Sequence, residues 1–168
     1  HTGNWEILSK IAAFTGLSKK KFGAIYRPLD AKAADNYVVK KRQENGCTMF
    51  PKSTAISAFG TFLREGGVLG ILADQRAGNA KKNNRKFFGV DSARSKLPAV
   101  LHLRTGVPLF SFCVYSSGPG RWNVDIKPIN LPNRKLSIDD VVEHITANYE
   151  RDFSKHLLDV FWMHRYWK

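Results

Sequence analysis

The chain has 168 residues, of which 43% are hydrophobic and 12% aromatic. This length and composition exclude a disordered chain and favour a single folded domain with its own core. Lysine and arginine number 27 against 14 acidic residues, a formal net charge of +13. That charge predicts an anionic partner, which could be nucleic acid, an anionic membrane, a phosphorylated substrate or an acidic protein.

Two further absences narrow the class of protein. Cys47 and Cys113 are too few for a disulfide framework and indicate a reducing compartment. No apolar run is long enough to cross a bilayer, and no signal peptide is recognisable. The chain begins with His1 rather than Met, so we expect an upstream segment, which could include a membrane helix.

The first six residues place His1 and Glu6 five positions apart. On a continuous helix this spacing would turn the two side chains away from each other. Gly3 permits a bend and Asn4 is a good N-cap, so the sequence predicts a helix that begins at Trp5 and carries Glu6 in its first turn. Glu6 could then hold one ring nitrogen of His1 and leave the other as a general base. A helix cap and a surface charge are the simpler interpretation of the same pair.

Helices and strands are predicted to alternate along most of the chain. The expected elements are a helix at 5–14, a strand at 22–26, a helix at 31–44, a strand at 48–51, a helix capped by Ser53, a strand at 68–73, a helix at 98–106, strands at 107–115 and 121–129, and a long helix from Ser137. This order predicts an α/β fold with a mostly parallel sheet flanked by helices and a late antiparallel hairpin.

Polar residues follow two of the predicted buried strands. Arg27 comes directly after the strand at 22–26, and Asp74, Gln75 and Arg76 follow the strand at 68–73. Ligands of open α/β sheets bind at the carboxyl ends of strands, so these four side chains are candidates for a binding site. The cationic stretch 79–86 is expected to be a solvated loop, with a mobile anion-binding flap as the alternative.

Several kinds of catalysis lack their signatures. The five histidines have no zinc-protease spacing, so no metal is expected, and neither a nucleophile elbow nor a glycine-rich phosphate loop is present. A base without a protein nucleophile suggests that the substrate supplies the nucleophile, such as a hydroxyl that is acylated.

Six blocks of sequence together carry a resemblance that covers the whole chain. They lie at residues 1–6, 26–30, 72–78, 86–89, 106–109 and 162–168. In this order they resemble the lysophospholipid acyltransferase superfamily, in the branch of the lauroyl/myristoyl acyltransferases of bacterial lipid A synthesis. The resemblance implies one glycerol-phosphate-acyltransferase-like domain over 1–168, with a strand and a membrane helix upstream of His1.

The resemblance also implies a reaction and its partners. A fatty acyl group would move from acyl carrier protein, or alternatively coenzyme A, to a hydroxyl of a lipid A precursor or a related anionic glycolipid. The enzyme would need no cofactor and would act at the cytoplasmic face of the inner membrane. His1 would be the general base and Glu6 its orienting carboxylate. Arg27 would hold the anionic group of the acceptor.

The third block, with Asp74, Gln75 and Arg76, would form the opposite wall of the site. Within the enzyme class, acylation of another glycolipid or of a lysophospholipid remains open. A basic nucleic-acid-binding domain is the main alternative outside it, but the cations are scattered and no binding motif is present, so nucleic acid is not expected. A catalytically degenerate membrane scaffold is a third possibility, which the intact pair of His1 and Glu6 disfavours.

Overall fold

The computed structural model describes residues 1–10, 21–78, 84–164 and 166–167. Its contacts divide the chain into two compact units. The first consists of His1–Trp5 with Leu72–Lys168, and the second is Glu6–Ile71. Both are built from helices and strands, so the predicted α/β class is confirmed.

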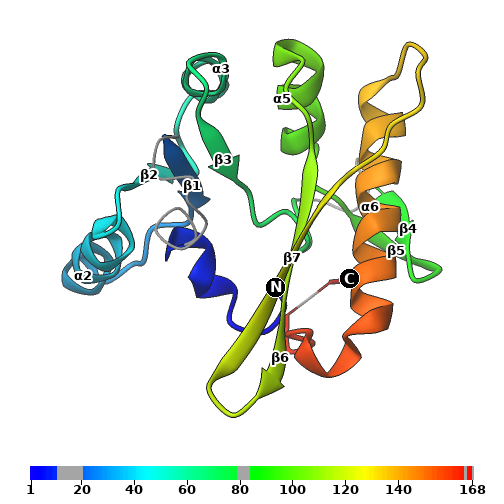
Figure 1. Cartoon of the computed structure of the whole chain (residues 1–168). Coiled ribbons are helices and arrows are strands. Elements are labelled where there is room, and N and C mark those ends of the chain that lie inside the picture. Colours follow the sequence, from blue (N-terminus) through cyan, green and yellow to red (C-terminus); the bar gives the residue numbers. More distant parts are fainter. Residues whose placement is uncertain (11–20, 79–83, 165, 168) are drawn as a thin grey trace. The chain divides into compact units, whose positions relative to one another are not determined.

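The second unit contains a parallel sheet of three strands in the order β2-β1-β3. Its elements are β1 (Phe22–Tyr26), α2 (Lys32–Gln43), β2 (Cys47–Pro51), α3 (Ile56–Arg64) and β3 (Val68–Gly70), and the 3-10 helix η1 (Trp5–Lys10) leads into it. Helix α2 packs on β2 and α3 on β3 (Figure 1). The core is aromatic, because Phe50 meets the ring edges of Phe59 and Phe62 at centroid distances of 5.5 and 5.1 Å.

The first unit combines two antiparallel hairpins with helices. Its elements are β4 (Asn84–Phe87), β5 (Val90–Ala93), α5 (Leu97–Thr105), β6 (Phe110–Gly118), β7 (Arg121–Pro128), α6 (Ile138–Lys155) and the 3-10 helix η3 (Leu157–Asp159). Strand β4 pairs with β5, and β6 with β7, which form the long hairpin of Figure 1.

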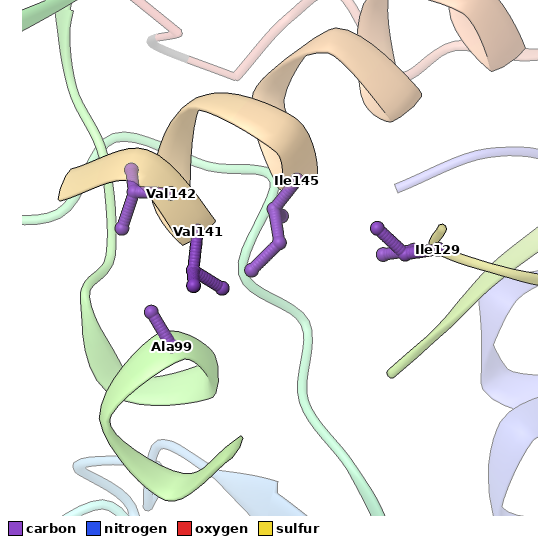
Figure 2. Packing of buried hydrophobic residues seen from close by; sticks show 5 residues of the cluster. All are labelled: Ala99, Ile129, Val141, Val142 and Ile145. Atoms are coloured by element: carbon purple, nitrogen blue, oxygen red, sulfur yellow. The ribbon is translucent and has the colours of Figure 1, made fainter. Parts of the chain in front are cut away.

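Two apolar clusters stabilise this unit. One joins α5 and α6 with the residue after β7, and Figure 2 shows Ala99 and Val141 pointing toward one another within it. Its buried members are Ala99, Ile129, Val141, Val142 and Ile145. The other cluster is largely aromatic and unites β4, α6 and the end of the chain through Phe87, Phe153, Val160 and Tyr166.

Most predicted elements are confirmed within a few residues. The strand at 22–26 has its predicted bounds, α5 ends at Gly106 in the left-handed conformation, and α6 begins after Ser137. The predicted start of a helix at Trp5 is also right, although η1 is a 3-10 helix and residues 11–14 lie outside the described part of the chain.

The expected sheet is confirmed in part: β1, β2 and β3 are parallel and β6–β7 is the predicted late antiparallel hairpin, but parallel strands are not the majority among the described residues. Of their seven strands, four lie in antiparallel hairpins. The β4–β5 hairpin was missed because residues 84–86 were assigned to a loop. Its two-residue turn has positive φ at both Phe88 (50°) and Gly89 (75°), and phenylalanine is an unusual residue there. The sequence therefore lacks the usual hairpin signal.

Two smaller predictions are also wrong. Helix α3 has Ala55 rather than Ser53 at its N-cap, because residues after β2 first form a turn in which Thr54 N–H donates to the Pro51 carbonyl at 2.9 Å. Strand β3 ends at Gly70 rather than at residue 73, because its ladder of hydrogen bonds with β1 stops at Gly70. No helix in the described residues has the length and apolarity needed to span a membrane.

Candidate functional site

The segment that carries His1 is fixed by backbone hydrogen bonds to residues 159–161. Phe161 N–H donates to the His1 carbonyl at 3.0 Å, and Gly3 N–H donates to the Asp159 carbonyl at 2.7 Å. Between them, Thr2 forms an antiparallel bridge with Val160. These contacts give His1 a defined position although it precedes the first helix.

Strand β6 holds the other side of the same segment. The hydroxyl of the buried Thr2 accepts the Val114 N–H at 3.0 Å. Gly3 has φ +46°, and a Cβ at this position would lie 2.7 Å from the Val114 carbonyl oxygen. The predicted bend at Gly3 is therefore present, and it also allows the backbone to approach β6 closely.

His1 is paired with the carboxylate of Asp74. The Nδ1 atom lies 2.8 Å from Oδ1, and the main-chain nitrogen of His1 bonds Oδ2. Asp74 is only 4% exposed and accepts a further hydrogen bond at 3.3 Å from the hydroxyl of Tyr166. A carboxylate accepts from Nδ1–H, so in the neutral imidazole Nε2 is the nitrogen that keeps its lone pair. This arrangement suits His1 as a general base through Nε2.

The side-chain amide of Gln75 covers the ring of His1. Its nitrogen lies 3.1 Å from both Nδ1 and Nε2. Equal distances to the two ring nitrogens place the amide nitrogen over the face of the imidazole, outside the plane of the Nε2 lone pair. Gln75 thus restricts access to one face of the ring.

Two aromatic rings border the imidazole. Trp5 presents an edge at a centroid distance of 4.8 Å, and the ring of His164 lies at 5.8 Å. These rings limit the directions from which a substrate can reach His1.

The other predicted site residues have different surroundings. Arg76 is exposed in the first unit, and Arg27 is exposed directly after β1 in the second. Glu6 also belongs to the second unit, where its carboxylate binds Arg42 at 2.5 Å and 3.0 Å. The structure thus brings His1, Asp74 and Gln75 together. The pairing of His1 with Glu6 stays a prediction.

The partnership of His1 with Asp74 was not foreseen from the sequence. Asp74 was selected because it follows a buried run, but no spacing rule connects it to a histidine 73 positions away. Tyr166 lies in the last of the six sequence blocks, at 162–168, where no local pattern marks it as a site residue. It is fully buried, and burial together with the charge of Asp74 raises its pKa, so its hydroxyl stays protonated and can donate.

Within the described residues, no group of histidine, cysteine and acidic side chains could hold a metal ion. The family model described as "Bacterial lipid A biosynthesis acyltransferase" matches residues 1–168 of the chain. No curated protein matches the chain.

Proposed function

We propose that the chain acylates a hydroxyl of a lipid A precursor or a related anionic glycolipid. The proposal starts from its family: the chain belongs to the bacterial lipid A biosynthesis acyltransferases and is an acyltransferase. The donor would be an acyl thioester on acyl carrier protein, with coenzyme A as the alternative carrier. The observation that best supports this chemistry is the hydrogen bond between His1 Nδ1 and Asp74, because it leaves Nε2 as a base.

The reaction needs no covalent enzyme intermediate. His1 Nε2 takes the hydroxyl proton while the hydroxyl oxygen attacks the thioester carbonyl. The carbon–sulfur bond then breaks, and the departing thiolate receives the proton from His1. The products are the acylated lipid and the free thiol. General-base assistance of this kind typically contributes ~10²–10⁴-fold to the rate.

The remaining site residues have proposed roles in binding and orientation. Glu6 would orient His1, as the resemblance implies, and Arg27 would bind a phosphate or sugar acid of the acceptor through its guanidinium group. Gln75 would restrain the imidazole from one face of the ring. Arg76 would supply a further positive charge to the wall of the site.

The charge of the chain supports the proposed partners and location. A net charge of +13 favours both an anionic lipid surface and an acidic carrier protein. As the family resemblance implies, we propose that the reaction takes place at the cytoplasmic face of the inner membrane, with 1–168 as the acyltransferase domain.

Acyl transfer from labelled acyl carrier protein to a lipid A precursor tests the proposal. The wild-type sequence should be compared with His1→Ala and Glu6→Ala. His144→Ala is the matched control, because His144 lies on α6 outside the site. We expect His1→Ala to abolish transfer and His144→Ala to retain it.

Two other results would change the conclusion. Full activity of His1→Ala would refute the mechanism. Transfer by the wild type to a different glycolipid or to a lysophospholipid, but not to the lipid A precursor, would keep the chemistry and change the acceptor.

A further inference from the structure

Arg94, which directly follows β5, is a buried cation whose two terminal nitrogens find no acceptor among the described residues. Only 2% of Arg94 is exposed to solvent. Neither Nη1 nor Nη2 has a hydrogen-bond partner among the residues that the structure describes. Buried guanidinium groups are normally paired, because removing an unpaired charge from water is unfavourable. Arg94 therefore lowers the stability of the fold, which suggests that it serves function.

Two aromatic side chains hold the guanidinium group. Its central carbon lies 4.3 Å from the ring centroid of Phe87 and 5.6 Å from that of Tyr149. Aromatic faces attract a cation but accept no conventional hydrogen bond. The rings therefore fix the position of the charge without neutralising it.

The surroundings connect Arg94 to the candidate site. Ala77 N–H donates to the carbonyl of Ala93 at 2.9 Å, which joins the segment after Asp74 to the end of β5. The ring of Tyr166 lies 5.9 Å from that of Phe87, while its hydroxyl contacts Asp74. Arg94 and Asp74 thus each contact a member of the same aromatic cluster, Phe87 and Tyr166 respectively.

Asp74 is the best balancing charge for Arg94. The titratable groups that act electrostatically on Arg94 are Tyr149, Asp74, Tyr166 and Glu150. Burial raises the pKa of both tyrosines, so these are neutral at neutral pH. Glu150 is partly exposed and accepts the Phe88 N–H at 2.5 Å, whereas Asp74 is buried. Burial lowers the pKa of Arg94, but arginine retains its proton at neutral pH.

We propose that Arg94 is a positioning residue for the acyl transfer. Its buried charge balances that of Asp74, and Asp74 in turn keeps the proton of His1 on Nδ1 and the lone pair on Nε2. The inference rests on the proposed function, since it assigns a residue that acts through Asp74 on the proposed base, His1. Arg94 itself contacts no reacting atom.

The test replaces Arg94 with Met, which keeps the length but removes the charge, and with Lys, which keeps a charge. Arg104→Met on α5 is the matched control, because Arg104 is exposed. For Arg94→Met we expect kcat to fall at least tenfold, within the ~10²–10⁴-fold contribution of a general base, while KM changes less than about twofold. Arg94→Lys should recover part of kcat.

A double-mutant cycle with Asp74→Asn shows whether the effect passes through Asp74. If it does, Arg94→Met should lower kcat little further in the Asp74→Asn background. Equal effects in both backgrounds would overturn the inference. So would an unchanged kcat, or a raised KM with unchanged kcat, which would make Arg94 a substrate contact. A fall of Tm in both Arg94 variants that parallels the loss of kcat would indicate a purely structural role and also overturn it.

A second readout separates this inference from the proposed function. Histidine-selective ¹⁵N NMR of the full chain reports which ring nitrogen of His1 is protonated, whether or not acyl transfer is observed. We expect the Nδ1–H form in the wild type and a loss of that form in Arg94→Met. An unchanged tautomer in Arg94→Met would overturn the inference, while a wild type that transfers no acyl group would count against the proposed function alone.

Discussion

His1 and Asp74 are 73 positions apart in the sequence, yet Nδ1 of His1 lies 2.8 Å from Oδ1 of Asp74. The bond connects the first residue with the segment that follows β3. Asp74 is buried and also receives the hydroxyl of Tyr166, so its carboxylate has a fixed direction. A carboxylate in this position selects the tautomer that a general base requires.

Asp74→Asn should therefore lower kcat by about 10²-fold or more, because the amide does not fix the proton on Nδ1 as a carboxylate does. Acyl-transfer kinetics of Asp74→Asn and Glu6→Gln, measured side by side, would compare the two effects. Asp91→Asn is the control, since Asp91 forms a surface ion pair with Lys86 at 2.7 Å. If Glu6→Gln is the more damaging change and Asp74→Asn retains wild-type kcat, Glu6 rather than Asp74 orients the base.

The close approach of Gly3 to β6 makes a second prediction. Gly3→Ala combines a positive φ with a Cβ placed 2.7 Å from the Val114 carbonyl oxygen. Gly120 also has positive φ (66°) but open space around its Cβ position, so Gly120→Ala measures the backbone strain alone. We expect Gly120→Ala to lose about 1 kcal/mol of stability and Gly3→Ala clearly more. Urea unfolding would show this, and equal losses would argue against the close contact.

Local signals in the sequence predicted much of the fold. Ser137 with two acids behind it defined the start of α6, and the apolar run at 22–26 defined β1. The β4–β5 hairpin could not be predicted because its turn places Phe88 at positive φ, a conformation that bulky residues rarely adopt. Propensities describe the average cost of a conformation, and here the surrounding contacts outweigh that cost.

The candidate site was predictable only in its parts. His1, Asp74 and Gln75 could each be selected from local patterns, but their contacts depend on how the chain returns on itself. The sequence contains no signal for Arg94, because a buried arginine looks like any surface arginine until its neighbours are known. Phe87 and Tyr149, which hold it, come from β4 and α6.

Burial of Cys47 predicts a pH dependence at the alkaline end. Burial raises the pKa of its thiol from 9.0 to about 11. The folded state therefore keeps a proton that the unfolded state loses, and this contribution to stability is present below pH ~9 and lost as the pH rises through about 11. Alkylation by iodoacetamide at pH 9 should be much slower in the folded chain than in urea. Similar rates in both would contradict the buried thiol.

The capping box of α6 predicts a pH dependence at the acidic end. The Ser137 N–H and hydroxyl donate to the carboxylate of Asp140 at 2.8 and 2.5 Å, and the Asp140 N–H donates to the Ser137 hydroxyl at 3.1 Å. The bonds from Ser137, and then the charge-assisted bond from Arg134, lower the pKa of Asp140 to about 2. Since the unfolded value is 3.8, the stabilisation is present above pH ~4 and lost as the pH falls through about 2.

Ser137→Ala should consequently reduce the free energy of unfolding by about 1 kcal/mol at pH 7, a typical effect for an N-cap. It should also reduce the difference in stability between pH 5 and pH 2, because Asp140 then loses its principal donor, the Ser137 hydroxyl. Ser154→Ala, an exposed serine near the other end of α6, serves as the control and should change neither quantity. Urea unfolding followed by circular dichroism at both pH values provides the measurement. If Ser137→Ala and the wild type lose the same stability on acidification, the Ser137 hydroxyl is not the donor that lowers the pKa of Asp140.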